Sequence, residues 1–424
     1  MNYRIIACIF FWFFGMGIAG EEHINKPASW TILVYIETTH GLQEWSFQNI
    51  HDMTLLNADN NVHLLVWLHA HGDEAWLYKV GNRSLKEEAT MVVLPDVAQN
   101  IVNAMQIAAS CYPADKYGLV LWDHGYGILT PYKDEETGEW DVAPDCVEEE
   151  DAPDLVECLC RPRYKGMLID AAHDTCLDHA GMIYACSAIY DILGKKLAFL
   201  GMDLCMGAMI EHAYQLAPYV EFMLGSQECE MPDGWDYAAL VRRLSSVPEI
   251  GARELVASII NDYNDYYEPR SPEGLYTHSA LDLSYALTFK EHAKRLVYLM
   301  KAVRDADAQF LGYVRNARKE SFSMAWKPMY IDLHDFYDHL LNYLKTYTLD
   351  ATHEHLLEDL QEELKLGCNL IDNMVVARTG GFAVERTHGP SIYFPQHRID
   401  NSYRTVLFAL HSSWLSFLEM IIEC

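Results

Sequence analysis

The sequence predicts an α/β protein in which helices cover both faces of a mostly parallel sheet. Five short runs are apolar on successive residues, which is typical of strands that are buried on both faces. The runs are 31–36, 63–68, 118–122, 196–202 and 221–225. Segments of helical length separate them, such as 96–110 and 179–193. Alternation of this kind favours an α/β/α sandwich with a mostly parallel sheet.

The first twenty residues predict a secretory signal peptide. Arg4 precedes an apolar run over 5–14, and small residues follow at Gly15, Gly17, Ala19 and Gly20. The run is too short to span a bilayer comfortably, and no other segment is apolar enough to do so. We therefore expect export, with the mature chain secreted, periplasmic or extracellular and not held in a membrane.

The remaining chain divides into a first domain over 21–247 and a C-terminal α+β subdomain over 248–424. The subdomain is mainly helical to about residue 347, and 375–395 is typical of a β segment. Within the first domain, residues 131–165 form an insertion that is rich in Asp and Glu without apolar periodicity. Such composition indicates an exposed segment between two core elements.

The net charge excludes some partners. The chain has 61 acidic and 31 basic residues, for a formal charge of -30. So acidic a surface repels nucleic acid and anionic lipid, and it favours cationic partners. Half of the composition is apolar, which is enough for one large core or two moderate ones.

Two predicted strands end at residues able to carry chemistry. The run 118–122 leads into His124, and the run 196–202 leads into Cys205. If these strands are neighbours in a parallel sheet, both residues emerge on the same rim. Histidine can accept the proton of a cysteine nucleophile near neutral pH. Gly125, which has no side chain, would let its N–H approach a developing oxyanion beside the N–H of Cys205.

Placement at strand ends does not by itself decide the matter. A cysteine at such a position is more often a buried structural thiol, and a histidine often only satisfies a loop. The chain has eleven cysteines and nineteen histidines, so some pair reaches a plausible rim by chance.

The surroundings of the pair resemble the clostripain-like cysteine peptidases (clan CD). Trp122-Asp-His-Gly125 is similar to their histidine motif, and Gly201-Met-Asp-Leu-Cys-Met-Gly207 is similar to their cysteine motif. Later segments resemble further family blocks in the same order: 211–214, 225–228, 232–237, 276–283 and 389–395. The likeness extends over roughly residues 30–418, far beyond a two-residue motif.

The resemblance implies a caspase-like fold for the first domain and an endopeptidase that acts on proteins or peptides. His124 would be the catalytic base and Cys205 the nucleophile, with no cofactor required for the chemistry. Asp203 and Asp233 would line the first specificity pocket, where carboxylates favour the cation of Arg or Lys. The alternative for both aspartates is an ordinary turn residue.

The insertion carries two further hypotheses. Family members are often matured by self-cleavage in this region, and Arg161, Arg163 and Lys165 are the candidate sites. Alternatively, these three residues only border an exposed loop. The acidic run also suits calcium, which prefers carboxylates, although it lacks the pattern of an EF-hand.

Two other classes of function remain open. His69-Ala-His71-Gly-Asp73 follows a predicted strand and has the spacing of some metal sites, so a metal-dependent hydrolase is one alternative. No further His/Asp constellation completes that site. The other alternative is a binding protein that keeps the caspase-like fold without its chemistry. The chain lacks a Gly-x-Ser-x-Gly elbow and a phosphate-binding Gly-Lys-Ser/Thr motif.

Overall fold

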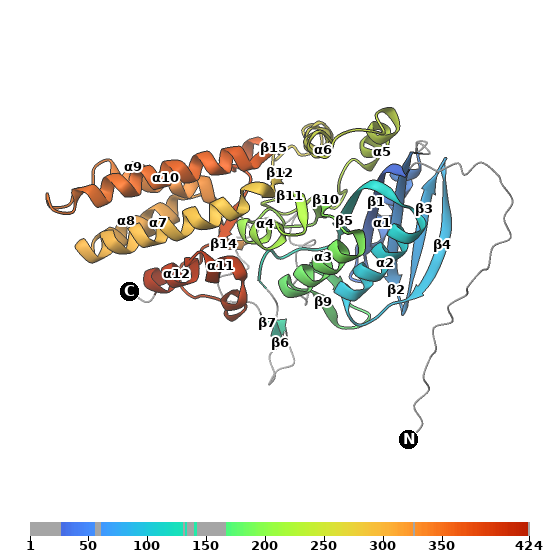
Figure 1. The fold of residues 1–424 in the computed structure, drawn as a ribbon, viewed down its shortest axis with the longest axis horizontal. Helices are drawn as coiled ribbons and strands as arrows, with labels where there is room; N and C mark the ends of the chain where they lie inside the picture. Colours follow the sequence, from blue (N-terminus) through green and yellow to red (C-terminus); the bar gives the residue numbers. More distant parts are fainter. Residues whose placement is uncertain are drawn as a thin grey trace, which may run out of the picture.

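The structure, a computed structural model, describes residues 27–55, 61–129, 132–133, 140–141, 167–324 and 327–422. Its centre is a nine-stranded sheet in the order β15-β12-β11-β10-β5-β1-β2-β3-β4. Figure 1 shows this sheet and its helices on one side of the molecule and a long helical extension on the other. The predicted signal peptide lies outside the described residues.

The five predicted strands form the middle of the sheet, and all neighbouring pairs among them are parallel. They are β1 (Ala28–Glu37), β2 (Val62–His71), β5 (Ala114–Trp122), β10 (Leu197–Asp203) and β11 (Val220–Gly225). Every residue of β1 and of β10 is buried, because helices cover both faces. The prediction of an α/β fold with a mostly parallel sheet is confirmed.

Antiparallel strands extend both edges of the sheet. On one edge, β3 (Glu74–Gly81) pairs with β2, and β4 (Ser84–Val92) pairs with β3. On the other edge, β12 (Thr277–Asp282) pairs with β11, and β15 (Val375–Gly380) pairs with β12. The last two strands lie beyond residue 247, so the sheet continues across the predicted domain boundary, which stays a prediction.

Alternate residues of the central strands face two separate cores. Leu33 and Tyr35 of β1 face one core, and Ile32 and Val34 face the other. Helices α2 (Val97–Cys111) and α3 (His179–Leu193) contribute to the first. Helices α1 (Gln43–Thr54), α5 (Tyr237–Ser246) and α6 (Ala252–Tyr267) contribute to the second. The sheet is therefore the middle layer of an α/β/α sandwich.

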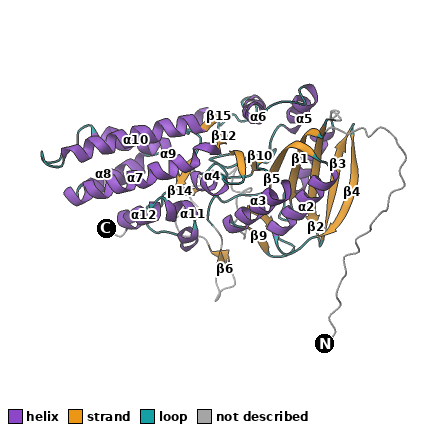
Figure 2. Cartoon of the chain, viewed as in Figure 1, coloured by secondary structure: helices purple, strands orange, loops and turns teal. Residues whose placement is uncertain are grey.

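The helical extension is built from the C-terminal half of the chain (Figure 2). Its helices are α7 (Ala286–Ala306), α8 (Phe310–Glu320), α9 (Leu333–Leu344), α10 (Glu354–Met374), α11 (Leu407–His411) and α12 (Trp414–Ile422). Helix α10 packs on both α7 and α9, and α4 (Ile210–Leu216) packs on α7 and α11. Because α4 directly follows the Cys205 segment, it connects the extension to the central sheet.

The remaining described strands and turns are short. The strands are β6 (Tyr132–Lys133), β7 (Trp140–Asp141), β8 (Met167–Asp170), β9 (Thr175–Leu177), β13 (Ser323–Met324), β14 (Lys327–Asp332) and β16 (Ser391–Tyr393). Three 3-10 turns cover Leu283–Tyr285, Phe382–Val384 and Asn401–Thr405. Strands β13, β14 and β16 form a small sheet between α4 and α9. In the described part of the chain, no helix is both long and apolar enough to cross a membrane.

Candidate active site

His124 and Cys205 leave equivalent positions of two adjacent parallel strands. Strands β5 and β10 pair in parallel, with Trp122 opposite Asp203. Each candidate residue lies two positions beyond this last pair, on the same rim of the sheet. Both side chains are partly exposed. The condition that the sequence left open, that the two strands are neighbours, is therefore met.

Gly125 lies directly against the backbone of Cys205. A Cβ atom on Gly125 would lie 2.2 Å from the carbonyl oxygen of Cys205 and 3.1 Å from its nitrogen. It would also lie 2.5 Å from Cδ1 of Leu204, so the close approach requires glycine. The predicted histidine, glycine and nucleophile thus lie together at one point of the rim.

The chain turns sharply after Cys205. Met206 has a φ of 57°, a conformation that non-glycine residues rarely adopt. The Met206 N–H donates to the carbonyl of Glu228 at 3.2 Å, and the Glu230 N–H donates to Sγ of Cys205 at the same distance. The loop after β11 therefore lies along the nucleophile. A backbone donor at the sulfur stabilises a thiolate relative to a thiol.

His124 is suited to act as a neutral base. Burial lowers its pKa and so does the nearby His40, while the charge of Cys205 and a hydrogen bond to the His40 backbone act in the opposite direction. The rings of His40 and His124 meet edge to face, with centroids 5.7 Å apart. His40 follows β1, the strand next to β5, and contacts His124 from that side. The sequence does not point to His40, because nothing in its local pattern distinguishes it from other histidines.

Asp203 lies at the base of the site, two residues before Cys205. Its side chain is only 3% exposed, and Oδ2 accepts hydrogen bonds from the Trp235 N–H at 3.2 Å and the Tyr237 hydroxyl at 2.7 Å. Burial raises the pKa of Asp203 to about 8, and the charge of Glu230 is the second largest cause of this rise. The carboxyl is therefore largely protonated at neutral pH when no cation is near.

The loop that carries Asp233 packs onto Asp203. Gly234 has a φ of +65°, and a Cβ there would lie 2.8 Å from Oδ2 of Asp203. Asn49 of α1 fixes the loop, because its amide donates to the Asp233 carbonyl at 2.6 Å and accepts from the Trp122 indole at 2.8 Å. Asp233 itself is partly exposed, with Tyr266 donating to its carboxylate at 3.3 Å. The structure thus brings the two predicted pocket aspartates to one region.

Glu230 is a second acid beside the nucleophile. Its side chain is 5% exposed, and hydrogen bonding from the Tyr263 hydroxyl only partly offsets the effect of burial on its pKa. Oε2 lies 3.5 Å from Nδ1 of His278, and burial raises the pKa of Glu230 well above its usual value. The segment 225–228 that resembles the family ends at Glu228, so Glu230 was not among the predicted site residues. The only local indication of a role for Glu230 is its position, two residues after the end of that segment.

His69, His71 and Asp73 do not form a metal site. His69 is buried, whereas His71 is exposed and the side chain of Asp73 is 81% exposed at the turn between β2 and β3. Nδ1 of His69 contacts Glu37 Oε2 and Nε2 contacts the Gly72 carbonyl, both at 2.9 Å. Both partners only accept, so both nitrogens carry hydrogen.

The charge of His69 agrees with this geometry. Burial disfavours the imidazolium, but the hydrogen bond and charge of Glu37, with further help from Gly72 and Asp170, raise the pKa of His69 to about 9. A protonated imidazole has no lone pair for a metal. The predicted metal constellation is therefore replaced by a buried ion pair, which braces the ends of β1 and β2.

The candidate processing residues Arg161, Arg163 and Lys165 lie outside the described residues. The chain that follows them is described from Met167. The Leu168 N–H donates to the carbonyl of His124 at 3.3 Å, and the Ile169 N–H donates to Oδ2 of Asp123 at 2.5 Å. The segment immediately after the insertion thus lies against the turn that carries His124.

Comparisons with known proteins identify the family of the chain. A sequence model of the clostripain family (peptidase C11) matches residues 34–157 and 165–419. No curated protein sequence matches the chain.

Among solved structures, a secreted C11 cysteine protease from Bacteroides thetaiotaomicron, in complex with an irreversible peptide inhibitor, is similar with a TM-score of 0.61. It is 18% identical, covering 91% of this chain and 99% of that one. An inactive zymogen C11 protease from Parabacteroides distasonis is similar with a TM-score of 0.59 and 15% identity, covering 92% and 99% of the two chains. The family match covers both segments that carry His124 and Cys205, and the chain belongs to the clostripain family of C11 cysteine peptidases.

Proposed function

We propose that this chain is a secreted endopeptidase that cleaves after Arg or Lys, with Cys205 as nucleophile and His124 as base. The observation that carries the proposal is a pair of buried acids, Asp203 and Glu230. Asp203 lies two residues before Cys205 in the sequence, and the backbone N–H of Glu230 contacts Sγ of Cys205. The predicted signal peptide supports secretion, as does the secreted protease among the similar structures.

The proposed reaction proceeds through a thioester. Sγ of Cys205 attacks the scissile carbonyl while His124 takes up the thiol proton. The bond to the leaving amine then breaks, and His124 returns the proton to that amine. Water attacks the resulting thioester, with His124 again as base, and Cys205 is regenerated. The N–H groups of Gly125 and Cys205 are the proposed donors to the oxyanion, because their backbones lie side by side.

Selection of a basic residue follows from the charges of the pocket. Burial raises the pKa of Asp203 to about 8 and raises the pKa of Glu230 as well, so burial disfavours the charged form of both acids when no cation is near. A guanidinium or ammonium that enters the pocket favours their ionised forms and makes charge-assisted hydrogen bonds. Asp233, partly exposed on the adjoining loop, is the proposed outer wall.

Self-cleavage at Arg161, Arg163 or Lys165 fits the same specificity. The described chain enters the insertion just beyond the histidine turn and leaves it at Met167, against that turn. Both ends of the insertion are therefore tethered to the catalytic rim, which gives the intervening segment a high effective concentration at the nucleophile.

Two experiments test the proposal. A panel of peptides that differ only in the residue before the cut should show cleavage after Arg or Lys and little after Ala or Glu. Equal cleavage after Ala or Glu, or unchanged activity in Cys205→Ala, would contradict it. For self-processing, the wild-type chain should mature to two chains, whereas Cys205→Ala should remain one. Two chains in the Cys205→Ala protein would reject self-cleavage without affecting the proposed specificity.

A further inference from the structure

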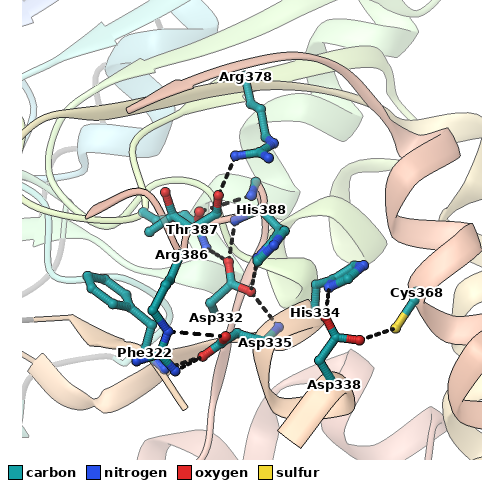
Figure 3. A network of polar contacts seen from close by, with 12 residues as sticks. Phe322, Asp332, His334, Asp335, Asp338, Cys368, Arg378, Arg386, Thr387 and His388 are labelled. Atoms are coloured by element: carbon teal, nitrogen blue, oxygen red, sulfur yellow. Dashed lines mark hydrogen bonds and ion pairs between the residues drawn. The ribbon is translucent and has the colours of Figure 1, made fainter. Parts of the chain in front are cut away.

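A second cluster of ligand-type side chains lies in the helical extension, apart from the peptidase site. His334 and Asp338 are one turn apart on α9, and Cys368 lies on the neighbouring helix α10. One potential ligand atom from each residue lies within 4.8 Å of the other two. We call these three residues the α9–α10 cluster. Figure 3 shows their side chains facing one another across the two helices.

The distances within the α9–α10 cluster are those of ligands around a small ion. Nδ1 of His334 lies 3.3 Å from Oδ2 of Asp338, and Sγ of Cys368 lies 3.8 Å from Oδ1 of Asp338. Cys368 is not in a disulfide and is partly buried. Asp338 is 53% exposed, so an ion could reach the cluster from solvent.

The imidazole of His334 is oriented for coordination. Its Nδ1 is buried and makes no hydrogen bond, in contrast to both nitrogens of His69. Its Nε2 faces Oδ1 of Asp372 at 3.8 Å. A histidine that binds a metal through one nitrogen usually directs the other N–H to a carboxylate. Asp372 lies one turn beyond Cys368 on α10 and occupies that place.

Further contacts hold the His334 ring in this orientation. The ring of His388 stacks on it with centroids 4.4 Å apart and an interplanar angle of 16°. Nδ1 of His388 is in turn 3.0 Å from Oδ1 of Asp332, whose carboxylate also caps α9 by accepting from the Asp335 N–H at 2.8 Å. Figure 3 shows Asp332 and His388 next to His334. The support behind the imidazole is therefore part of the fold itself.

We propose that the α9–α10 cluster binds a zinc ion through Nδ1 of His334, a carboxylate oxygen of Asp338 and the thiolate of Cys368. Three protein ligands of the N, O and S types match zinc, with water in the fourth position of a tetrahedron. Calcium and magnesium prefer oxygen ligands, which disfavours both ions here. The Cys368 thiol loses its proton when the ion binds. The site would join α9 to α10 and stabilise the helical extension, with no part in the peptidase reaction.

The test measures zinc binding to the full chain carrying Cys205→Ala, so that the catalytic thiol cannot contribute. Zinc chloride is titrated into this protein in the presence of a chromophoric competitor. The same titration is run on two further proteins, which carry His334→Ala or Cys368→Ser in addition to Cys205→Ala. Cys111→Ala is the control, because Cys111 is an exposed cysteine on α2. We expect one equivalent of zinc to be lost with His334→Ala and with Cys368→Ser, and to be retained with Cys111→Ala. Zinc binding that is the same in all four proteins would overturn the proposal.

Cobalt provides a second readout that distinguishes lost ligation from lost folding. Co²⁺ bound to the Cys205→Ala protein should give a thiolate-to-cobalt absorption band, which disappears with Cys368→Ser. Zinc should also raise the thermal unfolding midpoint of the Cys205→Ala protein but not that of the Cys368→Ser derivative. Matching midpoints of the two proteins without zinc would show that both are folded. A band or a zinc-dependent shift that survives Cys368→Ser would contradict the site.

Discussion

The backbone N–H of Glu230 donates to Sγ of Cys205 at 3.2 Å, and the side chain of the same glutamate is buried close enough to Asp203 for its charge to raise the pKa of that aspartate. One residue therefore contacts the nucleophile through its backbone and contributes a carboxyl through its side chain. In the proposed mechanism, Glu230 therefore positions the thiolate of Cys205 and also helps to bind the Arg or Lys side chain of the substrate.

Glu230→Gln should impair cleavage after basic residues specifically. The substitution keeps the N–H at Cys205 but removes the charge, so kcat/KM for Arg or Lys substrates should fall by about 2 kcal/mol or more, roughly 30-fold. Glu221→Gln, at an exposed position of β11, should have no effect. Steady-state kinetics with matched Arg and neutral substrates would check this. An equal loss on neutral substrates would assign Glu230 to the structure of the site only.

Asp203 should make recognition of basic substrates depend on pH. Its pKa of about 8 in the free enzyme means that a bound cation must displace a proton. KM for an Arg or Lys substrate should therefore fall as the pH rises from about 6 to about 8, and should level off above that. Asp203→Asn should raise KM and remove this dependence. A KM that is flat with pH in the wild type would contradict the assignment.

Gly125→Ala should strongly lower turnover, because the added Cβ would meet the carbonyl oxygen of Cys205 at 2.2 Å. Displacement of an oxyanion donor lowers kcat by about 100- to 1,000-fold in other peptidases. Gly194→Ala is the control, since its surroundings are open within 4 Å, although its φ of +65° carries some strain. The loss should appear in kcat, with folding checked by thermal unfolding. Near-normal kcat in Gly125→Ala would exclude this glycine from the site.

His69 should stabilise the fold at low pH more than at high pH. Its folded pKa of about 9 is raised above the unfolded value near 6.5, so its contribution is complete below about pH 6.5 and is lost as the pH rises through about 9. His69→Gln should therefore lower the unfolding midpoint more at pH 6 than at pH 9.5. His71→Gln, at the exposed end of the same strand, is the matched control. An equal effect of His69→Gln at both values would contradict the charged ion pair.

The sequence predicts the central strands because burial on both faces requires continuous apolar runs. Strand β4 gives no such signal, since its residues are mostly exposed and its pairing depends on β3. Strand β15 lies within the predicted β segment 375–395, but its partner is not predictable, because β12 and β15 pair across about a hundred residues of intervening chain.

The predicted residues of the site also have a local sequence pattern, whereas the missed residues are placed by tertiary contacts. His124 and Cys205 are predictable because each follows a buried strand within a motif that resembles the family. Glu230 reaches the nucleophile because Thr277 of β12 accepts from the N–H groups of Gln227 and Glu228, at 3.0 Å and 3.1 Å. That path of the loop is set by a strand about fifty residues away, which no local pattern reveals.

The most direct test of the account is covalent labelling with a thiol-reactive peptide that carries Arg or Lys before the reactive group. Wild-type protein should form one adduct per chain, located on Cys205 by mass spectrometry, and Cys205→Ala should form none. A matched probe with Ala in that position should label slowly. An adduct on another cysteine, or equal labelling by the Ala probe, would contradict the assigned nucleophile or the assigned pocket, respectively.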